Sequence, residues 1–253
     1  MSSFLDFGER WVVVTGASSG LGRACAQELS AHGARVLLVG RDRSTLASTR
    51  DTLTGTGHET LALDLQNLEA IASEVARIAQ DLGRLYGLCH AAGMVETGPL
   101  AAMTPETVRK MMTVNVLSGL ELARAVARRN VMDPEGGSLL FVSSVYGIVG
   151  AAGQSAYSAS KGAVTAAVRS LSIELARRRI RVNAISPGLV MTPMTETALA
   201  ALSREQVAAI EQRHPLGLGT PADVARAAVF LLAPATRWIT GIDLVVDGGY
   251  CAQ

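Results

Sequence analysis

The sequence predicts an α/β protein with a doubly wound, seven-stranded, mostly parallel sheet that carries helices on both faces. Short runs rich in β-branched residues and leucine alternate with longer helical patterns along the whole chain. A glycine-rich turn follows the first of these runs. Hydrophobic residues make up 49% of the chain, which suits a sheet buried on both faces. These three observations together indicate a Rossmann fold.

One domain, spanning residues 1–253, is expected because no Pro/Gly/Ser-rich linker divides the chain. The predicted strands are 11–15, 35–39, 60–63, 85–89, 138–142, 181–185 and 243–246. Helices are predicted from 24 to about 33, at 68–82, after a cap at Thr104, from about 116 to 129, and from 154 to about 178. A polar, helix-prone insertion at about 190–215 is expected to form a lid over the site.

Charge and cysteine content exclude several classes of function. The chain has 23 basic and 22 acidic residues, which argues against nucleic acid or an anionic membrane as the main partner. Its three cysteines show neither Cys-x-x-Cys nor metal-ligand spacing, so no metal is expected. Residues 1–8 lack the features of a secretion signal, and no apolar run is long enough to span a membrane. A cytoplasmic location is therefore predicted.

The turn after the first strand predicts a dinucleotide site. Its spacing is Gly-x-x-x-Gly-x-Gly, and a helix follows directly. Such a turn lets the backbone approach a pyrophosphate, whose charge meets free N–H groups and the positive end of the helix dipole. The residues expected to contact the cofactor here are Gly16, Ser18, Ser19, Gly20, Leu21 and Gly22.

The end of the second strand bears on the choice between NADP and NAD. An acidic residue at this point usually binds the ribose 2′-hydroxyl, whereas an arginine accepts a 2′-phosphate. Here Gly40 stands in that place and Arg41 follows, which favours NADP(H). Asp42 leaves NAD(H) open, because a turn shifted by two residues would bring its carboxylate to the ribose, and a solvated Arg-Asp-Arg turn is a third reading.

Tyr157 and Lys161 are spaced for proton transfer. Residues four apart on a helix share a face, so the ammonium can lie near the phenol and favour its ionised form. The chain has only two lysines, Lys110 and Lys161, among its 23 basic residues. A lysine kept at this position suits a role that arginine fills poorly. The bare five-residue pattern also arises by chance, so its surroundings have to decide.

Several motifs in the same order resemble the short-chain dehydrogenase/reductase family over the whole chain, including its 3-oxoacyl-(acyl-carrier-protein) reductases. Besides the glycine turn and the Tyr157/Lys161 pair, the resemblance rests on Asp64-Leu65 after the third strand, Asn115, and Ser144 thirteen residues before Tyr157. It also includes the segment from Pro187 to Thr192. The cofactor contacts that the resemblance adds are Arg41, Asp64, Leu65, Ala91, Ala92, Gly93, Tyr157, Lys161, Pro187, Gly188, Val190 and Thr192.

The resemblance implies a catalytic set of Asn115, Ser144, Tyr157 and Lys161. Tyr157 would give a proton to the substrate oxygen as hydride arrives, and Ser144 would hydrogen-bond that oxygen. Lys161 would lower the pKa of Tyr157 and hold the nicotinamide ribose, while Asn115 would position a water that reaches Lys161. The segment 187–192 would hold the nicotinamide carboxamide.

One motif departs from the family pattern. After the fourth strand the family usually has Asn-Asn-Ala-Gly, and this chain has His90-Ala91-Ala92-Gly93. A histidine at a strand end more often satisfies local hydrogen bonds than transfers a proton. We therefore expect a structural role for His90.

The substrate wall is expected to combine 145–154 with the lid, and its side chains are small or apolar: Val145, Ile148, Val149, Ala151, Met194, Leu199 and Leu202. This favours a neutral or apolar carbonyl compound over a polyanion. Arg128, Arg129 and Arg178 could dock an acyl carrier protein, although solvated helix ends explain them as well.

The predicted function is an NADP(H)-dependent oxidoreductase that interconverts a carbonyl and a secondary alcohol, with 3-oxoacyl thioester reduction as one candidate. The alternatives are an NAD(H)-dependent alcohol or sugar dehydrogenase, and a non-catalytic nucleotide-sensing protein. The two long helices from 116 and 154, together with the last strand and the tail from Gly248 to Tyr250, resemble the family's subunit interfaces. We therefore predict a homotetramer or a dimer.

Overall fold

A single seven-stranded sheet organises the chain. The computed structural model describes residues 4–200 and 202–252. The strand order is β3-β2-β1-β4-β5-β6-β7, and all six neighbouring pairs are parallel. The strands are β1 Trp11–Thr15, β2 Arg35–Gly40, β3 Glu59–Ala62, β4 Leu85–His90, β5 Gly137–Val142, β6 Ile180–Pro187 and β7 Asp243–Val246. The predicted Rossmann fold is confirmed, and the predicted strand ends match these or differ by at most two residues.

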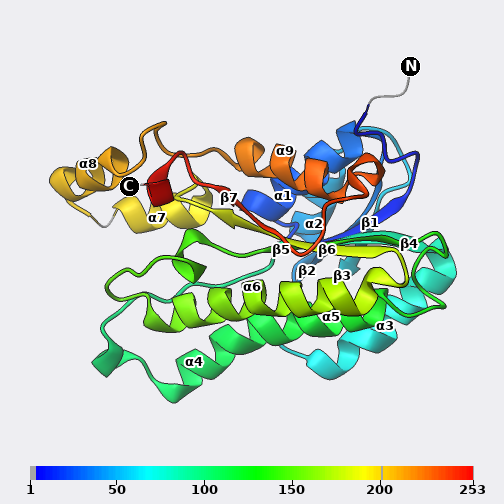
Figure 1. Ribbon diagram of the computed structural model, residues 1–253, viewed down its shortest axis with the longest axis horizontal. Helices are drawn as coiled ribbons and strands as arrows, with labels where there is room; N and C mark the ends of the chain where they lie inside the picture. Colours follow the sequence, from blue (N-terminus) through cyan, green and yellow to red (C-terminus); the bar gives the residue numbers. More distant parts are fainter. Residues whose placement is uncertain (1–3, 201, 253) are drawn as a thin grey trace.

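Helices cover both faces of the sheet (Figure 1). One face carries α1 and α9, and the other carries α3, α5 and α6. The helices are α1 Gly20–Ala31, α2 Arg43–Arg50, α3 Leu68–Leu82, α4 Pro105–Met112, α5 Ser118–Val126, α6 Ser155–Ala176, α7 Pro193–Ala200, α8 Arg204–Gln212 and α9 Pro221–Leu232. Because parallel strands are joined by crossover helices, this layering follows from the alternating pattern of the sequence.

Two hydrophobic cores lie on the two faces, and β1 contributes to both. Trp11 and Val13 pack in the core under α3, α5 and α6, while Val12 and Val14 pack in the core under α1 and α9. Successive side chains of a strand point to opposite faces, so a continuous apolar run fills both cores. This is why the first strand has no polar residue before Thr15.

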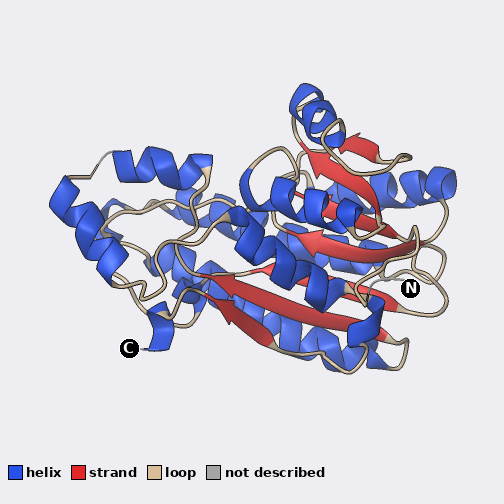
Figure 2. Cartoon of the chain, turned by 90° about the horizontal axis from the view of Figure 1, so that it is seen from above, coloured by secondary structure: helices blue, strands red, loops and turns tan. Residues whose placement is uncertain are grey.

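The order of the strands reverses between β1 and β4, and this point fixes where a ligand can bind. β2 and β3 extend from β1 in one direction, whereas β4 to β7 extend in the other. The connections leaving β1 and β4 therefore diverge, which leaves a crevice at the carboxyl ends of the strands. Figure 2 shows the chain from above, with two helices of the C-terminal half, α7 and α8, standing beyond the ends of the strands.

The helix expected from about 116 to 129 differs in the structure. α4 and α5 are joined without a break by a π-helical turn, Thr113–Leu117, and α5 ends at Val126. A π turn inserts one extra residue into the helical ladder and usually marks a functional site. Here it carries Asn115 into the interior, where that residue is 1% exposed.

Candidate active site

Loops that are far apart in the sequence approach one another at the crevice. Glycines at the points of contact make this approach possible. Gly16 has φ 65°, and a methyl group added there would stand 2.9 Å from Cα of Ala92. A methyl group at Gly20 would stand 3.5 Å from Cγ2 of Thr192. The loops after β1, β4 and β6 therefore converge on one place, as the sequence predicted for a cofactor site.

The turn after β2 is held by Asp42, which begins α2. Its carboxylate accepts hydrogen bonds from the Thr45 backbone N–H at 2.8 Å and from the Ser44 hydroxyl at 2.6 Å. These bonds, first that of Ser44, lower the pKa of Asp42. The carboxylate is thus committed to capping the helix, and Arg41 is exposed beside it.

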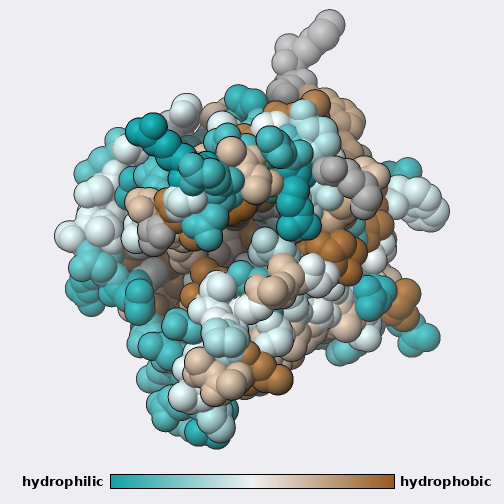
Figure 3. All heavy atoms as spheres, turned by 90° about the vertical axis from the view of Figure 1, so that its left-hand side faces the viewer, coloured by the Kyte–Doolittle hydropathy of each residue, from teal (hydrophilic) through white to brown (hydrophobic). Residues whose placement is uncertain are grey.

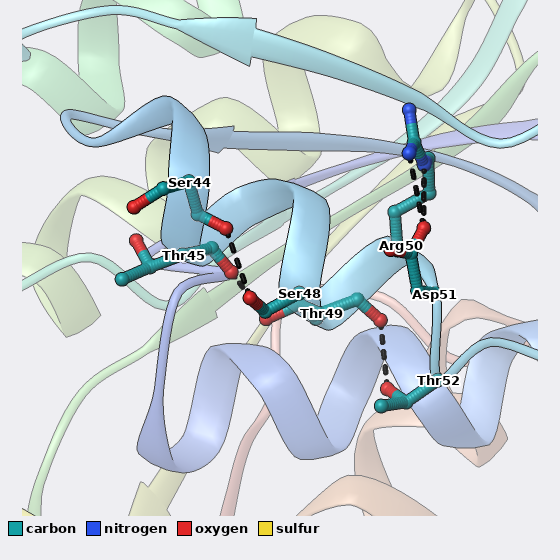
Figure 4. A network of polar contacts seen from close by, with 7 residues as sticks. All are labelled: Ser44, Thr45, Ser48, Thr49, Arg50, Asp51 and Thr52. Atoms are coloured by element: carbon teal, nitrogen blue, oxygen red, sulfur yellow. Dashed lines mark hydrogen bonds and ion pairs between the residues drawn. The ribbon is translucent and has the colours of Figure 1, made fainter.

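The rest of α2 is a polar surface helix, shown in Figure 4. The hydroxyl of Ser48 donates to the Ser44 carbonyl at 3.0 Å, and the hydroxyl of Thr52 donates to the Thr49 carbonyl at 2.7 Å. Arg50 pairs with Asp51 at 3.0 Å. Arg50 therefore lies in a local pair at the far end of the helix, while Arg41 stands at the crevice end of β2.

The other segments predicted to contact the cofactor border the same edge of the sheet. Asp64 is exposed after β3, where its carboxylate accepts the Gln66 N–H at 3.0 Å, and Leu65 is buried in the core. Pro187 ends β6 beside Val246 of β7. A cavity of about 310 Å³ adjoins this segment and is lined by residues of 188–190, 216–219, 223–224 and 246–248.

Tyr157 and Lys161 lie on one face of α6, as their spacing predicted. The Lys161 ammonium is 5.6 Å from the centroid of the Tyr157 ring. It donates a hydrogen bond of 2.8 Å to the Val142 carbonyl at the end of β5. Lys161 is 4% exposed, so strand β5 holds its ammonium inside the fold.

The pKa of the Tyr157 phenol is shifted in the direction opposite to the predicted one. Burial raises the pKa of Tyr157 to about 12, and the hydrogen bond from Ser144 opposes this effect. Burial also lowers the pKa of Lys161 to about 8. Lys161 does not contribute the expected lowering, because its ammonium points to the Val142 carbonyl, and removal of the phenol from water sets the direction.

Asn115 ties the π turn to the loop after β4. Its side-chain oxygen accepts the Met94 N–H at 2.8 Å, and its amide group donates to the Met94 carbonyl and to the Ser160 hydroxyl, each at 2.9 Å. A methyl group at Gly93 would lie 3.4 Å from the Asn115 oxygen and 3.5 Å from the Lys161 nitrogen. Both amide protons of Asn115 already donate hydrogen bonds. A water bound by this side chain would therefore donate to its oxygen, which also accepts the Met94 N–H.

His90 joins β4 to β1 through Thr15. The Ala92 N–H donates to the Thr15 hydroxyl at 3.1 Å, and that hydroxyl lies 2.9 Å from Nδ1 of His90. The hydroxyl and Nδ1 share a hydrogen bond whose donor is set by the tautomer of the ring. Burial, with the charge of Lys161, lowers the pKa of His90 to about 3, so the ring is neutral near pH 7. These contacts support the structural role expected for His90.

The His90 ring requires glycine at position 119. A methyl group there would stand 2.8 Å from Cδ2 of His90. Gly119→Ala is expected to destabilise the protein by about 1–3 kcal/mol, as overpacking does. Adding His90→Asn should recover most of that loss, because the smaller side chain vacates the space. Urea unfolding of the two single variants and the double variant measures the coupling, and additive losses would contradict it.

The substrate side contains two further aromatic residues: Tyr146 lies within the predicted wall segment 145–154, whereas the sequence did not assign Tyr250 to the site. Tyr146 follows Ser144, and Tyr250 lies in the C-terminal turn, Tyr250–Ala252. Their rings contact each other, and Tyr146 also contacts Tyr157. No local pattern marks Tyr250, since about ninety residues separate it from Tyr157 and only the fold brings them together.

The insertion predicted to act as a lid forms α7 and α8, and His214 connects it to the segment 187–192. The backbone N–H of Leu189 donates to Nε2 of His214 at 3.3 Å, and Nδ1 lies 2.9 Å from the Ile210 carbonyl. Of the predicted wall residues, Val145 is buried, whereas Ile148 and Met194 are 51% and 56% exposed. Figure 3 looks onto this side of the molecule and shows a hollow in its surface.

No helix within residues 4–200 and 202–252 is both long and apolar enough to cross a membrane. Within the same ranges, no group of three or more His, Cys, Asp or Glu residues is arranged to hold a metal. Cys25 and Cys89 are buried, and Cys251 is half-buried; all three are free thiols.

Known proteins with this sequence pattern carry out redox chemistry. A family model described as enoyl-(acyl carrier protein) reductase matches residues 16–251. The chain is 37% identical over 241 residues to carbonyl reductase family member 4 of Danio rerio, covering 95% of this chain and 97% of that protein. It is 35% identical over 238 residues to a 3-oxoacyl-(acyl-carrier-protein) reductase of Vibrio cholerae, covering 94% and 95%.

A solved structure from Beutenbergia cavernae superimposes with a TM-score of 0.92 at 33% identity, covering 99% of this chain and all of that one. It is described as a candidate NAD(P)-dependent gluconate 5-dehydrogenase with NADP bound at low occupancy. Sequence, fold and relatives agree over nearly the whole length. The chain belongs to the short-chain dehydrogenase/reductase family and is an oxidoreductase that acts on carbonyl or alcohol groups with NAD(P).

Proposed function

We propose that the protein is an NADP(H)-dependent oxidoreductase that interconverts a ketone and a secondary alcohol, with Tyr157 as general acid and base. One observation carries this proposal. Ser144, Tyr157 and Lys161 gather at the carboxyl edge of the sheet, where glycines let the loops after β1, β4 and β6 approach one another closely. The bound nicotinamide would supply or accept the hydride.

Side chains of the protein would transfer the proton and stabilise the developing charge. The phenol of Tyr157 donates it to the substrate oxygen during reduction, and the Ser144 hydroxyl stabilises the negative charge that develops there. Lys161, fixed by the Val142 carbonyl, places a positive charge beside the phenol. Asn115 holds the Met94 backbone and Ser160, and through them the wall beside Lys161. In oxidation the same groups act in reverse.

The preference for NADP(H) is supported by the turn after β2. Asp42 is engaged in capping α2, and Arg41 is exposed where the strand ends. A guanidinium at this point suits a phosphate, with which it forms charge-assisted hydrogen bonds. We therefore favour NADP(H), with NAD(H) as the alternative.

Arg41→Ala tests the cofactor preference. We expect kcat/KM for NADPH to fall about 10- to 100-fold, the range for losing a hydrogen bond to a charged group, while kcat/KM for NADH changes less than about twofold. Arg50→Ala is the matched control, since Arg50 pairs with Asp51 at the other end of α2. A wild-type preference for NADH that survives Arg41→Ala would remove the argument for NADP(H).

Several substrate classes remain as proposals. Reduction of a 3-oxoacyl thioester is supported by the relatives named as 3-oxoacyl reductases, and alcohol or sugar oxidation is the alternative. Comparing acetoacetyl-CoA with crotonyl-CoA separates carbonyl reduction from the enoyl reduction named in the family description. We expect turnover of the former only. The alternative of a non-catalytic nucleotide-sensing protein is set aside, because the chain belongs to a family of oxidoreductases.

Carrier-protein docking at Arg128, Arg129 and Arg178 gains no support from the structure. Arg178 follows the C-terminus of α6, roughly 30 Å along the helix axis from Tyr157 at 1.5 Å per residue. Its guanidinium donates to the Ala127 carbonyl. These arginines therefore lie at the opposite end of α6 from the site.

Self-association as a homotetramer, or as a dimer, stays our prediction, and so does a cytoplasmic location. Apolar surface for self-association lies at the last strand: Val245 of β7 and Ile242, directly before it, are each 39% exposed, and Phe230 of α9 is 37% exposed. The predicted interface consists of β7, the long helices and the tail from Gly248 to Tyr250, in which the Tyr250 side chain is buried within its own chain.

A further inference from the structure

Three tyrosines from different parts of the chain form a connected row beginning at the proposed proton donor. The rings of Tyr157 and Tyr146 lie 6.5 Å apart at 76°, and those of Tyr146 and Tyr250 lie 6.4 Å apart at 86°. Both are edge-to-face contacts, the preferred arrangement of aromatic pairs. The row leads from the first turn of α6, past the loop after β5, to the C-terminal turn.

The hydroxyl of Tyr250 is buried and has no hydrogen-bond partner among the residues the structure describes. Tyr250 as a whole is 8% exposed. Its phenol lies near that of Tyr146 and adds to the effect of burial in raising the pKa of Tyr146, although the two hydroxyls do not meet hydrogen-bond geometry. A buried hydroxyl without a partner is unfavourable, so this position is explained if a bound molecule supplies an acceptor.

The main chain fixes Tyr250 in this place. The carboxylate of Asp247 accepts the Gly249 N–H at 2.9 Å and the Cys251 N–H at 2.7 Å, which clamps the residues on both sides. The His214 ring lies 4.8 Å from the Tyr250 ring on the lid side. The Tyr250 side chain is therefore held between the lid and the loop that carries Tyr146, and it is preorganised.

A positively charged side chain lies over the Tyr250 ring. The Arg213 guanidinium, at the end of α8, is 4.7 Å from the centroid of Tyr250. Its charge also acts on the Tyr146 phenol. A cation over an aromatic ring draws electron density toward itself, which makes the phenol a better hydrogen-bond donor. The surroundings therefore favour an acceptor oxygen opposite Tyr250.

We propose that the hydroxyls of Tyr250 and Tyr146 bind a second oxygen atom of the substrate, so that the enzyme selects ketones and alcohols that also carry a carboxylate or ester. This inference deepens the proposed function and rests on it, because Tyr157 has to bind the reacting oxygen. It adds polar recognition to a wall that the sequence predicted to be apolar. Tyr250 and Tyr146 are specificity residues here, and neither takes part in proton transfer.

Two pairs of ketones of similar shape test the inference. Ethyl 3-oxobutanoate is paired with heptan-2-one, and 4-oxocyclohexanecarboxylate with 4-methylcyclohexanone. For at least one pair, wild-type kcat/KM should be at least about tenfold higher for the member with the second oxygen, the size of one hydrogen bond to such a group. Tyr250→Phe should remove about tenfold of that preference, mainly through KM, and leave the plain ketone within about twofold.

Tyr86→Phe is the matched control, because its hydroxyl donates to the Leu232 carbonyl in the core under α9. It should leave the preference unchanged. Equal kcat/KM within both pairs, or an unchanged preference in Tyr250→Phe, overturns the inference while leaving the proposed function intact. If no ketone is reduced with either cofactor, the proposed function fails instead. Calorimetric binding of 4-oxocyclohexanecarboxylate then decides, and equal affinity of wild type and Tyr250→Phe contradicts a role for this hydroxyl.

Discussion

Replacing Tyr157 with phenylalanine is expected to lower kcat by a factor of about 10²–10⁴, the range that general acid–base catalysis contributes. The substitution removes only the hydroxyl, so the edge contact with the Tyr146 ring, at 6.5 Å, should persist. Steady-state rates with NADPH and with NADH, on a ketone that the wild type accepts, measure the effect. NADPH fluorescence should show that the variant still binds the cofactor.

Tyr86→Phe again provides the control for this substitution. It removes a buried hydrogen bond of 3.1 Å to the Leu232 carbonyl and should cost about 1 kcal/mol of stability while leaving kcat unchanged. If Tyr157→Phe turned over every accepted substrate at the wild-type rate, the proton would have to come from another group, and the mechanism proposed for Tyr157 would be wrong.

Lys161→Met should abolish turnover and weaken cofactor binding. At neutral pH, the same substitution should nevertheless raise the free energy of unfolding. Burial lowers the pKa of Lys161 from 10.5 to about 8. The unfolded chain therefore binds more protons than the folded chain between those values, and the free energy of unfolding rises with pH in this window. Below pH 8 the full penalty for burying the charge is present, about 3 kcal/mol at 1.36 kcal/mol per pKa unit.

The variant lacks this penalty, although it loses the bond to the Val142 carbonyl. Relative to Lys161→Met, the wild type should gain about 2 kcal/mol of stability between about pH 7.5 and 9.5, measured by urea unfolding without cofactor. Lys110→Met, at the chain's other lysine, which is exposed on α4, should follow the wild-type curve. Parallel curves for wild type and Lys161→Met would show that the buried ammonium is not responsible.

The fold could be predicted because its signals are local and repeated. The run from Trp11 to Thr15 fills both cores, and β1 matches the predicted strand residue for residue. Caps at Asn67 and Thr104 begin α3 and α4, and the glycine turn leads into α1. Each of these features depends on neighbours within a few residues, where spacing alone decides which face is buried.

The candidate site was predicted in part. A spacing of four residues places Tyr157 and Lys161 on one face of α6, and the structure places Asn115 and Gly93 beside them. The direction of the pKa shift of Tyr157 could not be predicted. It depends on how much water the folded chain removes from the phenol and on where the Lys161 ammonium points, which the Val142 carbonyl of β5 sets.

The sequence by itself therefore determined the doubly wound sheet, the edge at which a dinucleotide would bind, and the pairing of Tyr157 with Lys161. The tertiary structure alone decided that Asp42 caps α2, that a π turn carries Asn115 inward, and that Tyr250 returns to the site. The physical reason is the separation along the sequence over which each feature is encoded. Periodicity and turns are encoded over a few residues, whereas burial, hydrogen-bond partners and contacts across ninety residues exist only once the chain has folded.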